Sequence, residues 1–248
     1  VELAMNIADA QSEFMKATGA SREFAGSISG LTQDVRAFGA SSKEVGAAMQ
    51  SLFATTTDFT MMSRQARDEM VRNSAALAAL GVSNEDFARG SQIAIKAMGQ
   101  TGTQAATTQR EIAALAMDIG IAPQQMAADF ATAGPQLAKF GSDGVRAFKD
   151  LAIAAKVTGI EVGRLLSITE KFDTFEGAAT AAGKLNAALG GNFVNAMELV
   201  TATDPVERMK MIRNSILDAG LAFDEMSYYQ RKLYAESAGL QDEAELAA

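Results

Sequence analysis

Glycines recur along the whole chain, each after an apolar or small residue and before a stretch that can start a helix. This regular spacing of glycine turns restricts the folds that the chain can adopt. Glycine adopts the left-handed backbone conformation that ends an α-helix, and a Ser, Thr or Asp shortly after it can cap the next helix. The separations are 20, 42, 18, 21, 21, 18, 61 and 19 residues, mostly near multiples of 20. We therefore predict short helices joined by turns at Gly19, Gly39, Gly81, Gly99, Gly120, Gly141, Gly159, Gly220 and Gly239.

Several helix starts can be placed from local chemistry. Ser41 with Glu44, and Ser83 with Asp86, have the spacing of a capping box, in which an N-cap side chain and an acid three residues later satisfy each other's backbone N–H groups. The stretch 204–207, Asp-Pro-Val-Glu, combines a cap, a proline at the first helical position and an acid at the third. We expect helices to begin after each of these caps.

Between the turns, apolar residues step by three and four, as on one face of an α-helix. Only three prolines occur in 248 residues. These features predict an all-α fold without a sheet, an irregular array of short antiparallel or crossed helices with glycine-capped turns. The stripes are Phe24, Ile28, Leu31, Val35 and Phe38; Val145, Phe148, Leu151 or Ala152, and Ala155; and Val162, Leu165, Thr169 and Phe172.

The array divides into two regions on sequence grounds. Residues 1–170 carry most of the glycine turns, and residues 171–248 contain a segment rich in Gly and Ala. The two regions are also compatible with one continuous domain. The first residues lack an initiator Met and the last are still helix-like, so we expect a piece of a longer polypeptide.

The composition excludes several kinds of chemistry. The chain has no cysteine and no histidine, which removes disulfides, Cys nucleophiles, His acid–base catalysis and nearly every zinc arrangement. The net charge is −8, and the basic residues are dispersed, so nucleic acid is not expected as a specific partner. We predict no catalytic, cofactor-binding or metal-binding residues.

The stretch GAATAAGKL, residues 177–185, superficially resembles a phosphate-binding loop. A Walker loop has four residues between its first glycine and its Gly-Lys, then Ser or Thr, and follows a strand. Here five residues intervene, Leu185 replaces the hydroxyl, and an amphipathic helical pattern precedes the stretch. We interpret it as a helix whose small residues let another helix approach closely, within the chain or between copies. The predicted packing or self-association residues are Gly177, Ala181, Gly183, Leu185, Leu189, Gly190 and Phe193, with Lys184 as a surface charge.

Membrane insertion is not expected. The charge-free segments 45–57, 97–109 and 185–197 are each 13 residues long and rich in polar or small residues. A spanning helix needs about 18 to 20 apolar residues.

The amino-acid sequence of the second region, residues 171–248, resembles that of a known protein family. The stretches KFDTFEGAATAAGKLNAALGGNFVNAMELV and DPVERMKMIRNSILDAGLAFDEMSYYQRKLYAESAGL, with the glycine-punctuated array before them, resemble the tail tape measure proteins of tailed bacteriophages, particularly contractile-tailed ones. The likeness begins at about Phe38 and is strongest over residues 171–240.

The resemblance implies a structural virion protein. Such a protein lies in the lumen of the tail tube, sets the tube length during assembly and is ejected ahead of the DNA. It implies several copies side by side, contacts with tail tube and baseplate hub proteins, and transient contact with the host envelope. The expected location is the virion tail, and the host cytoplasm during assembly.

Two other function classes stay open from the sequence. One is a helical cell-wall hydrolase of the lytic transglycosylase kind, with a lone catalytic acid among Glu161, Glu170, Glu176 and Glu198. The other is a helical scaffold component unrelated to phage.

Overall fold

The structure is a computed structural model that describes residues 2–247, and every regular element among them is helical. The predicted all-α fold without a sheet is therefore confirmed over this range. The chain forms two compact units, Val1–Val145 and Arg146–Ala248, which we call unit 1 and unit 2. The boundary falls within helix α8 (Gly144–Thr158), whereas residue 170, where the sequence suggested a division, lies inside unit 2.

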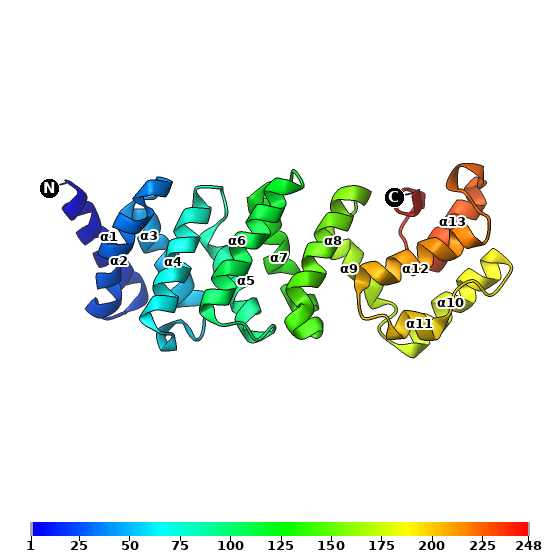
Figure 1. The fold of residues 1–248 in the computed structure, drawn as a ribbon, viewed down its shortest axis with the longest axis horizontal. Helices are drawn as coiled ribbons and strands as arrows, with labels where there is room; N and C mark the ends of the chain where they lie inside the picture. Colours follow the sequence, from blue (N-terminus) through cyan, green and yellow to red (C-terminus); the bar gives the residue numbers. More distant parts are fainter. Residues whose placement is uncertain (1, 248) are drawn as a thin grey trace. The chain divides into compact units, whose positions relative to one another are not determined.

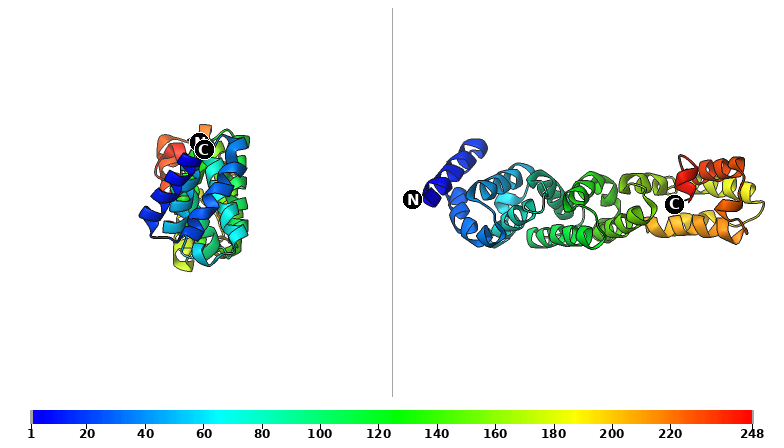
Figure 2. Two further views of the ribbon diagram at one scale, coloured as in Figure 1. Left: turned by 90° about the vertical axis from the view of Figure 1, so that its left-hand side faces the viewer. Right: turned by 90° about the horizontal axis from the view of Figure 1, so that it is seen from above.

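Unit 1 is built from helices stacked in two layers (Figures 1 and 2). In one layer α1 packs on α3, α3 on α5 and α5 on α7; in the other α2 packs on α4 and α4 on α6. This order is typical of stacked helical repeats, in which each helix pair contacts its neighbours along the chain. The helices are α1 (Glu2–Thr18), α2 (Arg22–Val35), α3 (Ser42–Thr55), α4 (Arg64–Ala78), α5 (Asn84–Lys96), α6 (Gly102–Asp118) and α7 (Pro123–Leu137), with 3-10 turns η1 (Arg36–Phe38), η2 (Phe59–Met61) and η3 (Ala138–Asp143).

The glycine turns are confirmed. All nine predicted turn glycines have a positive φ, and Gly190 is a tenth. At Gly81, with φ 86°, the chain leaves α4, and the N–H of Val82 donates to the carbonyl of Leu77 at 3.2 Å, the bond that closes a Schellman turn. Ser83 then caps α5 by accepting from the N–H of Asp86. One glycine, one apolar residue and one cap thus reverse the chain between two helices.

The sequence period of about 20 residues corresponds to one helix, and the structural repeat to two. Gly39, Gly81 and Gly120 lie at equivalent turns, where an even-numbered helix leads into the next odd-numbered one. The 42-residue gap after Gly39 arises because the α3–α4 connection has no glycine. That connection uses η2, whose Phe59 is fully buried and fixes the loop to the core.

Close helix contacts in unit 1 depend on glycines inside helices. A Cβ added to Gly134 of α7 would lie 2.1 Å from Cδ1 of Ile93 of α5, and one added to Gly90 would lie 2.4 Å from Nε2 of Gln109. Large side chains fill the remaining core, including the fully buried Phe87. Burying each such side chain contributes roughly 1.5–3 kcal/mol.

Unit 2 contains most of α8, then α9 (Val162–Glu170), α10 (Phe175–Leu189), α11 (Ala196–Thr201), α12 (Pro205–Asp218), the 3-10 turn η4 (Phe223–Glu225), α13 (Tyr228–Ala238) and α14 (Glu243–Ala247). Helix α10 packs on α11 and α13, α12 on α9, and α13 on α14. Its core includes Phe172, Leu185, Leu199, Ile212 and Tyr234.

The predicted helix caps are confirmed, with one correction to the apolar stripes. Ser41 and Glu44 form a capping box, and Asp204 accepts from the N–H groups of Val206 and Glu207. Phe38, however, was wrongly placed on the buried face of the preceding helix. The α-helix ends at Val35, the chain tightens into η1, and Phe38 is 60% exposed.

Within residues 2–247, no helix is long and apolar enough to cross a membrane.

Candidate functional site

The small-residue segment predicted as a packing site forms α10 in unit 2. Thr174 caps the helix, since its Oγ1 accepts from the N–H of Gly177 at 3.1 Å. Gly183 and Lys184 lie inside the helix, and Lys184 is exposed. A phosphate-binding loop presents free backbone N–H groups, whereas this stretch is continuous helix. The helical interpretation of GAATAAGKL is therefore confirmed.

The buried face of α10 is formed by Ala178, Ala182 and Leu185. Leu185 was predicted, and it is fully buried in the unit 2 core. Ala181 and Leu189 are half-buried and pack against the edge of that core. Small residues do bring α10 close to its neighbours, but Ala178 and Ala182 lie one position from those chosen.

The two predicted glycines in the helix have opposite surroundings. A Cβ on Gly177 would lie 2.2 Å from the backbone carbonyl oxygen of Lys171, so only glycine fits the first turn of α10. A Cβ on Gly183 would have no neighbour within 4 Å. Close packing within unit 2 therefore explains Gly177 and does not explain Gly183.

The C-terminal end of α10 is fixed by one asparagine. Gly190 closes the helix with φ 75°. The Oδ1 atom of Asn186 accepts from the N–H groups of Phe193 and Val194 at 2.9 and 2.8 Å, and its Nδ2 donates to the carbonyl of Val194 at 2.8 Å. Phe193, predicted as an apolar anchor, is 38% exposed, whereas its neighbour Val194 is buried. The asparagine bonds thus turn Val194, rather than Phe193, into the core.

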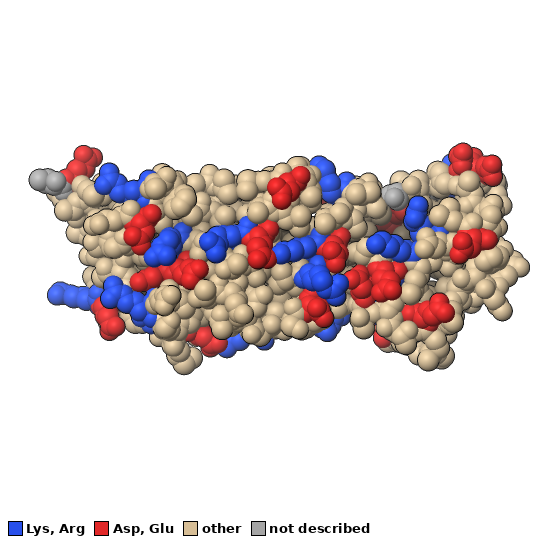
Figure 3. Space-filling model, viewed as in Figure 1, with Lys and Arg blue, Asp and Glu red and all other residues tan. Residues whose placement is uncertain are grey.

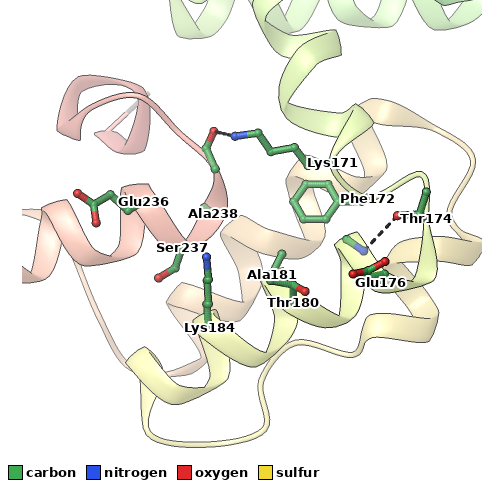
Figure 4. Close-up of a pocket in the computed structure, with 12 residues that line it drawn as sticks. Lys171, Phe172, Thr174, Glu176, Thr180, Ala181, Lys184, Glu236, Ser237 and Ala238 are labelled. Atoms are coloured by element: carbon green, nitrogen blue, oxygen red, sulfur yellow. Dashed lines mark hydrogen bonds between the residues drawn. The ribbon is translucent and has the colours of Figure 1, made fainter.

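A shallow recess of about 480 Å³ lies between α10 and the end of α13 (Figure 4). Lys171 crosses its upper side and donates from Nζ to the carbonyl of Gly239 at 2.7 Å, which satisfies the C-terminus of α13. Lys184, Glu176 and Glu236 contribute charges of both signs. The recess therefore lies between two helices, is open to solvent, and has both acidic and basic side chains in its lining. Its lining residues are Lys171, Phe172, Thr174, Glu176, Gly177, Thr180, Ala181, Lys184, Glu236, Ser237, Ala238 and Gly239.

Sequence reasoning missed a buried arginine that connects three segments of unit 2. Arg208 of α12 is 7% exposed. Its Nε donates to the carbonyl of Ala202 at 2.6 Å, its Nη1 donates to the carbonyl of Thr169 at 3.0 Å, and Nη1 also pairs with Asp173. The guanidinium thereby donates hydrogen bonds to two carbonyls that lack a helical partner: that of Ala202, just after α11, and that of Thr169, in the last turn of α9. The sequence contained a signal for this burial, because Arg208 follows Pro205 by three residues and precedes Ile212 by four, and so lies on the buried face of α12.

The carboxylates considered for catalysis come from different parts of unit 2. Glu161, Glu176 and Glu198 are exposed, and Glu170 is half-buried at the end of α9. Glu161 lines a recess beside α14, Glu176 lines the recess beside α10, and Glu198 accepts from Nδ2 of Asn195 at 3.2 Å. Within the described range, no group of three or more carboxylates could hold a metal ion.

Comparison with protein-family models, curated proteins and solved structures gives no match.

Proposed function

We propose that this chain is a structural part of a phage tail, a folded helical region of a tape measure protein that acts by shape and association rather than by catalysis. In this role it sets the length of the tail tube, is ejected during DNA delivery, and engages the baseplate hub or tail tip at one end. The observation that carries the proposal is the resemblance of residues 171–240 to such proteins.

The fold supports a role based on shape. Residues 171–240 belong to a compact unit in which the Gly and Ala positions of the resembling stretch contribute to packing, as at Gly177, Ala178 and Ala182. Unit 1 stacks short helices in two layers, an architecture that presents extended surfaces to partners.

The surface charges support protein partners over nucleic acid. On the face in Figure 3, basic and acidic groups are interspersed rather than gathered into a field of one sign. Neighbouring surface charges of opposite sign also form ion pairs in unit 1, as with Arg72 and Asp34 at 2.9 Å and Lys96 and Asp58 at 2.6 Å. Binding to a phosphate backbone requires a concentrated positive stripe.

Tail length tests the length-setting role. Because Gly81 and Gly120 lie at equivalent turns, deleting residues 82–120 removes one helix pair and joins α4 to α7 through the same kind of turn. The phage encoding this chain should then build shorter tails, and a tandem duplication of the same residues should build longer ones. The change in tail length is at most about 60 Å, which is the length of residues 82–120 drawn out as one continuous α-helix with a rise of about 1.5 Å per residue. Equal tail lengths in the deletion, the duplication and the parent would refute this role.

Association between copies is tested at the exposed side of α10. Gly183 faces open space within its own unit, so a close contact there requires a second molecule. Gly183→Leu should weaken self-association in analytical ultracentrifugation. Lys184→Ala, at the next position and also exposed but lining the recess beside α13, should leave self-association nearly unchanged. The reverse order would contradict a contact through Gly183.

The absence of catalysis is tested by a cell-wall assay on the purified chain. We expect no release of soluble wall fragments. Release that is abolished by Glu→Gln at one of positions 161, 170, 176 or 198 would replace the structural proposal with a hydrolase.

A further inference from the structure

Two neighbouring methionines of unit 1 have very different surroundings. The chain has 13 methionines and no cysteine, so thioethers carry all of its sulfur-based oxidation chemistry. Met61, in η2, is 78% exposed. Met62, the next residue, is half-buried and packs against the unit 1 core. Solvent therefore reaches both side chains, and of the two it is Met62 that takes part in the packing of the helices.

The sulfur of Met62 lies against the first residue of α6. A Cβ added to Gly102 would be 2.8 Å from Sδ of Met62 and 3.2 Å from Sδ of Met70, which is fully buried in α4. The two sulfurs and the backbone of Gly102 are thus in close contact, with no room for one more carbon. Helix α6 starts at this point, with the capping box that Thr101 forms with Gln104.

The backbone of Met62 is held in place on its other side. Its N–H donates to the carbonyl of Asp58 at 3.1 Å, and its carbonyl accepts from Nη1 of Arg67 at 2.9 Å. The guanidinium of Arg67 stacks on the ring of Phe24, 4.7 Å from the centroid. A larger group on the sulfur of Met62 must therefore displace the start of α6 or turn the side chain out to solvent. Either response separates Met62 from Gly102.

We propose that Met62 is a redox-sensitive site, at which oxidation by a peroxide loosens the contact between the η2–α4 segment and α6. One oxygen of hydrogen peroxide bonds to Sδ as the O–O bond breaks, the sulfur loses two electrons, and the other oxygen leaves as water with both protons. The sulfoxide is polar and larger by one oxygen atom. The thioether of Met70 and the Cα of Gly102 give it no hydrogen-bond donor, so its burial is unfavourable. The proposal does not depend on the tail function.

Met61 and Met70 provide controls within the same unit. Met61 is more exposed than Met62, so peroxide oxidises it at least as fast, but its sulfoxide remains in solvent. Met70 is fully buried and is oxidised only when unit 1 opens, at least about tenfold more slowly than Met61. Only at Met62 do solvent access and a close contact with α6 coincide. Reduction of the sulfoxide by methionine sulfoxide reductases makes the change reversible.

The site is tested by treating the full chain with hydrogen peroxide and locating the sulfoxides by peptide mass spectrometry. Oxidation should lower the thermal unfolding midpoint by about 3–10 °C in the parent and equally in Met61→Leu. Met62→Leu, a volume-conserving change, should lose less than half as much, because the other methionines are common to all three proteins. Met62→Gln, which places a polar group at the same position, should lower the midpoint without peroxide. Treatment with the reductases should restore the oxidised parent.

Hydrogen exchange separates loosening at α6 from general destabilisation. The N–H of Thr101 donates to Oε1 of Gln104 at 2.8 Å and reports on the start of α6, whereas the N–H of Asp86 donates to Oγ of Ser83 at 3.0 Å and reports on the start of α5. Oxidation should speed exchange at Thr101 roughly two- to tenfold in the parent but not in Met62→Leu, and should leave Asp86 unchanged.

Three results would overturn the proposal. The first is Met62 remaining a thioether while Met61 is fully converted. The second is an equal loss of midpoint in Met62→Leu and the parent. The third is unchanged exchange at Thr101 once Met62 is oxidised.

Discussion

Alanine substitution at two glycines of α10 should have effects of opposite sign on the stability of unit 2. In Gly177→Ala the new Cβ would lie 2.2 Å from the carbonyl oxygen of Lys171 and 3.0 Å from Oγ1 of Thr174, the cap of the helix. A backbone atom cannot rotate away as a flexible side chain can, so the first turn of α10 must shift. In Gly183→Ala the Cβ enters open space on the same helix.

The magnitudes follow from these surroundings. Overpacking costs about 1–3 kcal/mol, and loss of the Thr174 cap adds about 1 kcal/mol. Replacing a helical glycine by alanine offsets about 1 kcal/mol of this. We expect Gly177→Ala to lower the free energy of unfolding by about 1–3 kcal/mol and Gly183→Ala to raise it by about 0.5–1 kcal/mol. With a urea m-value of about 1.5 kcal/mol per molar, the midpoints should differ by at least about 1 M.

Tyrosine fluorescence during urea unfolding is a suitable assay. All three tyrosines, Tyr228, Tyr229 and Tyr234, lie in unit 2, and the hydroxyl of Tyr234 donates to the carbonyl of Ala188 in α10. The signal therefore follows the unit that carries both substitutions. Midpoints shifted in the same direction, or by equal amounts, would refute the argument that close approach at Gly177, rather than helix propensity, dominates this segment.

Three further predictions concern a buried charge, a titration and a helix cap. Arg208→Met should lower the stability of unit 2 by about 3–5 kcal/mol, because it leaves the buried carbonyls of Thr169 and Ala202 without the donor that Arg208 supplies. Arg213→Met, at an exposed position of the same helix, should change the stability by less than about 0.5 kcal/mol, and equal shifts in urea midpoint would contradict the role of Arg208. The hydrogen bonds from Arg164 of α9 lower the pKa of Glu245 in α14. The pair should therefore stabilise the contact between these two helices above the ordinary carboxyl pKa of 4.5 and lose this contribution as the pH falls through the lowered value. A carboxyl-carbon NMR titration of Glu245 would follow this loss, and a midpoint at or above 4.5 would be inconsistent with the pair. Ser41→Ala should remove the capping box with Glu44 and destabilise unit 1 by about 1 kcal/mol in thermal unfolding followed by circular dichroism, and an unchanged midpoint would show that the cap contributes little.

The local structure of this protein could be predicted from sequence because it depends on residues close together in the chain. The left-handed turns at Gly81 and Gly120, and the caps at Ser41 and Asp204, form from a few neighbouring residues and were placed correctly. The all-α fold follows from the same punctuation combined with helical apolar spacing.

The position of each helical face relative to other segments was decided only by the tertiary structure. Gly177 and Gly183 lie in one helix of uniform small residues, and only the path of the backbone at Lys171 makes the first indispensable and leaves the second in open space. Arg208 is buried because two other helices end around its guanidinium.

The same distinction holds for the order of the helices. Turn chemistry fixes where each helix of unit 1 begins and ends, but the two layers, α1 to α3 to α5 to α7 and α2 to α4 to α6, arise from contacts between helices that are not consecutive in the sequence. Many sequences with glycine turns and apolar stripes satisfy the local rules equally well. The sequence by itself therefore determined the helices and their turns, and the tertiary structure decided which side chains share a core, because packing depends on shape complementarity between segments far apart in the chain.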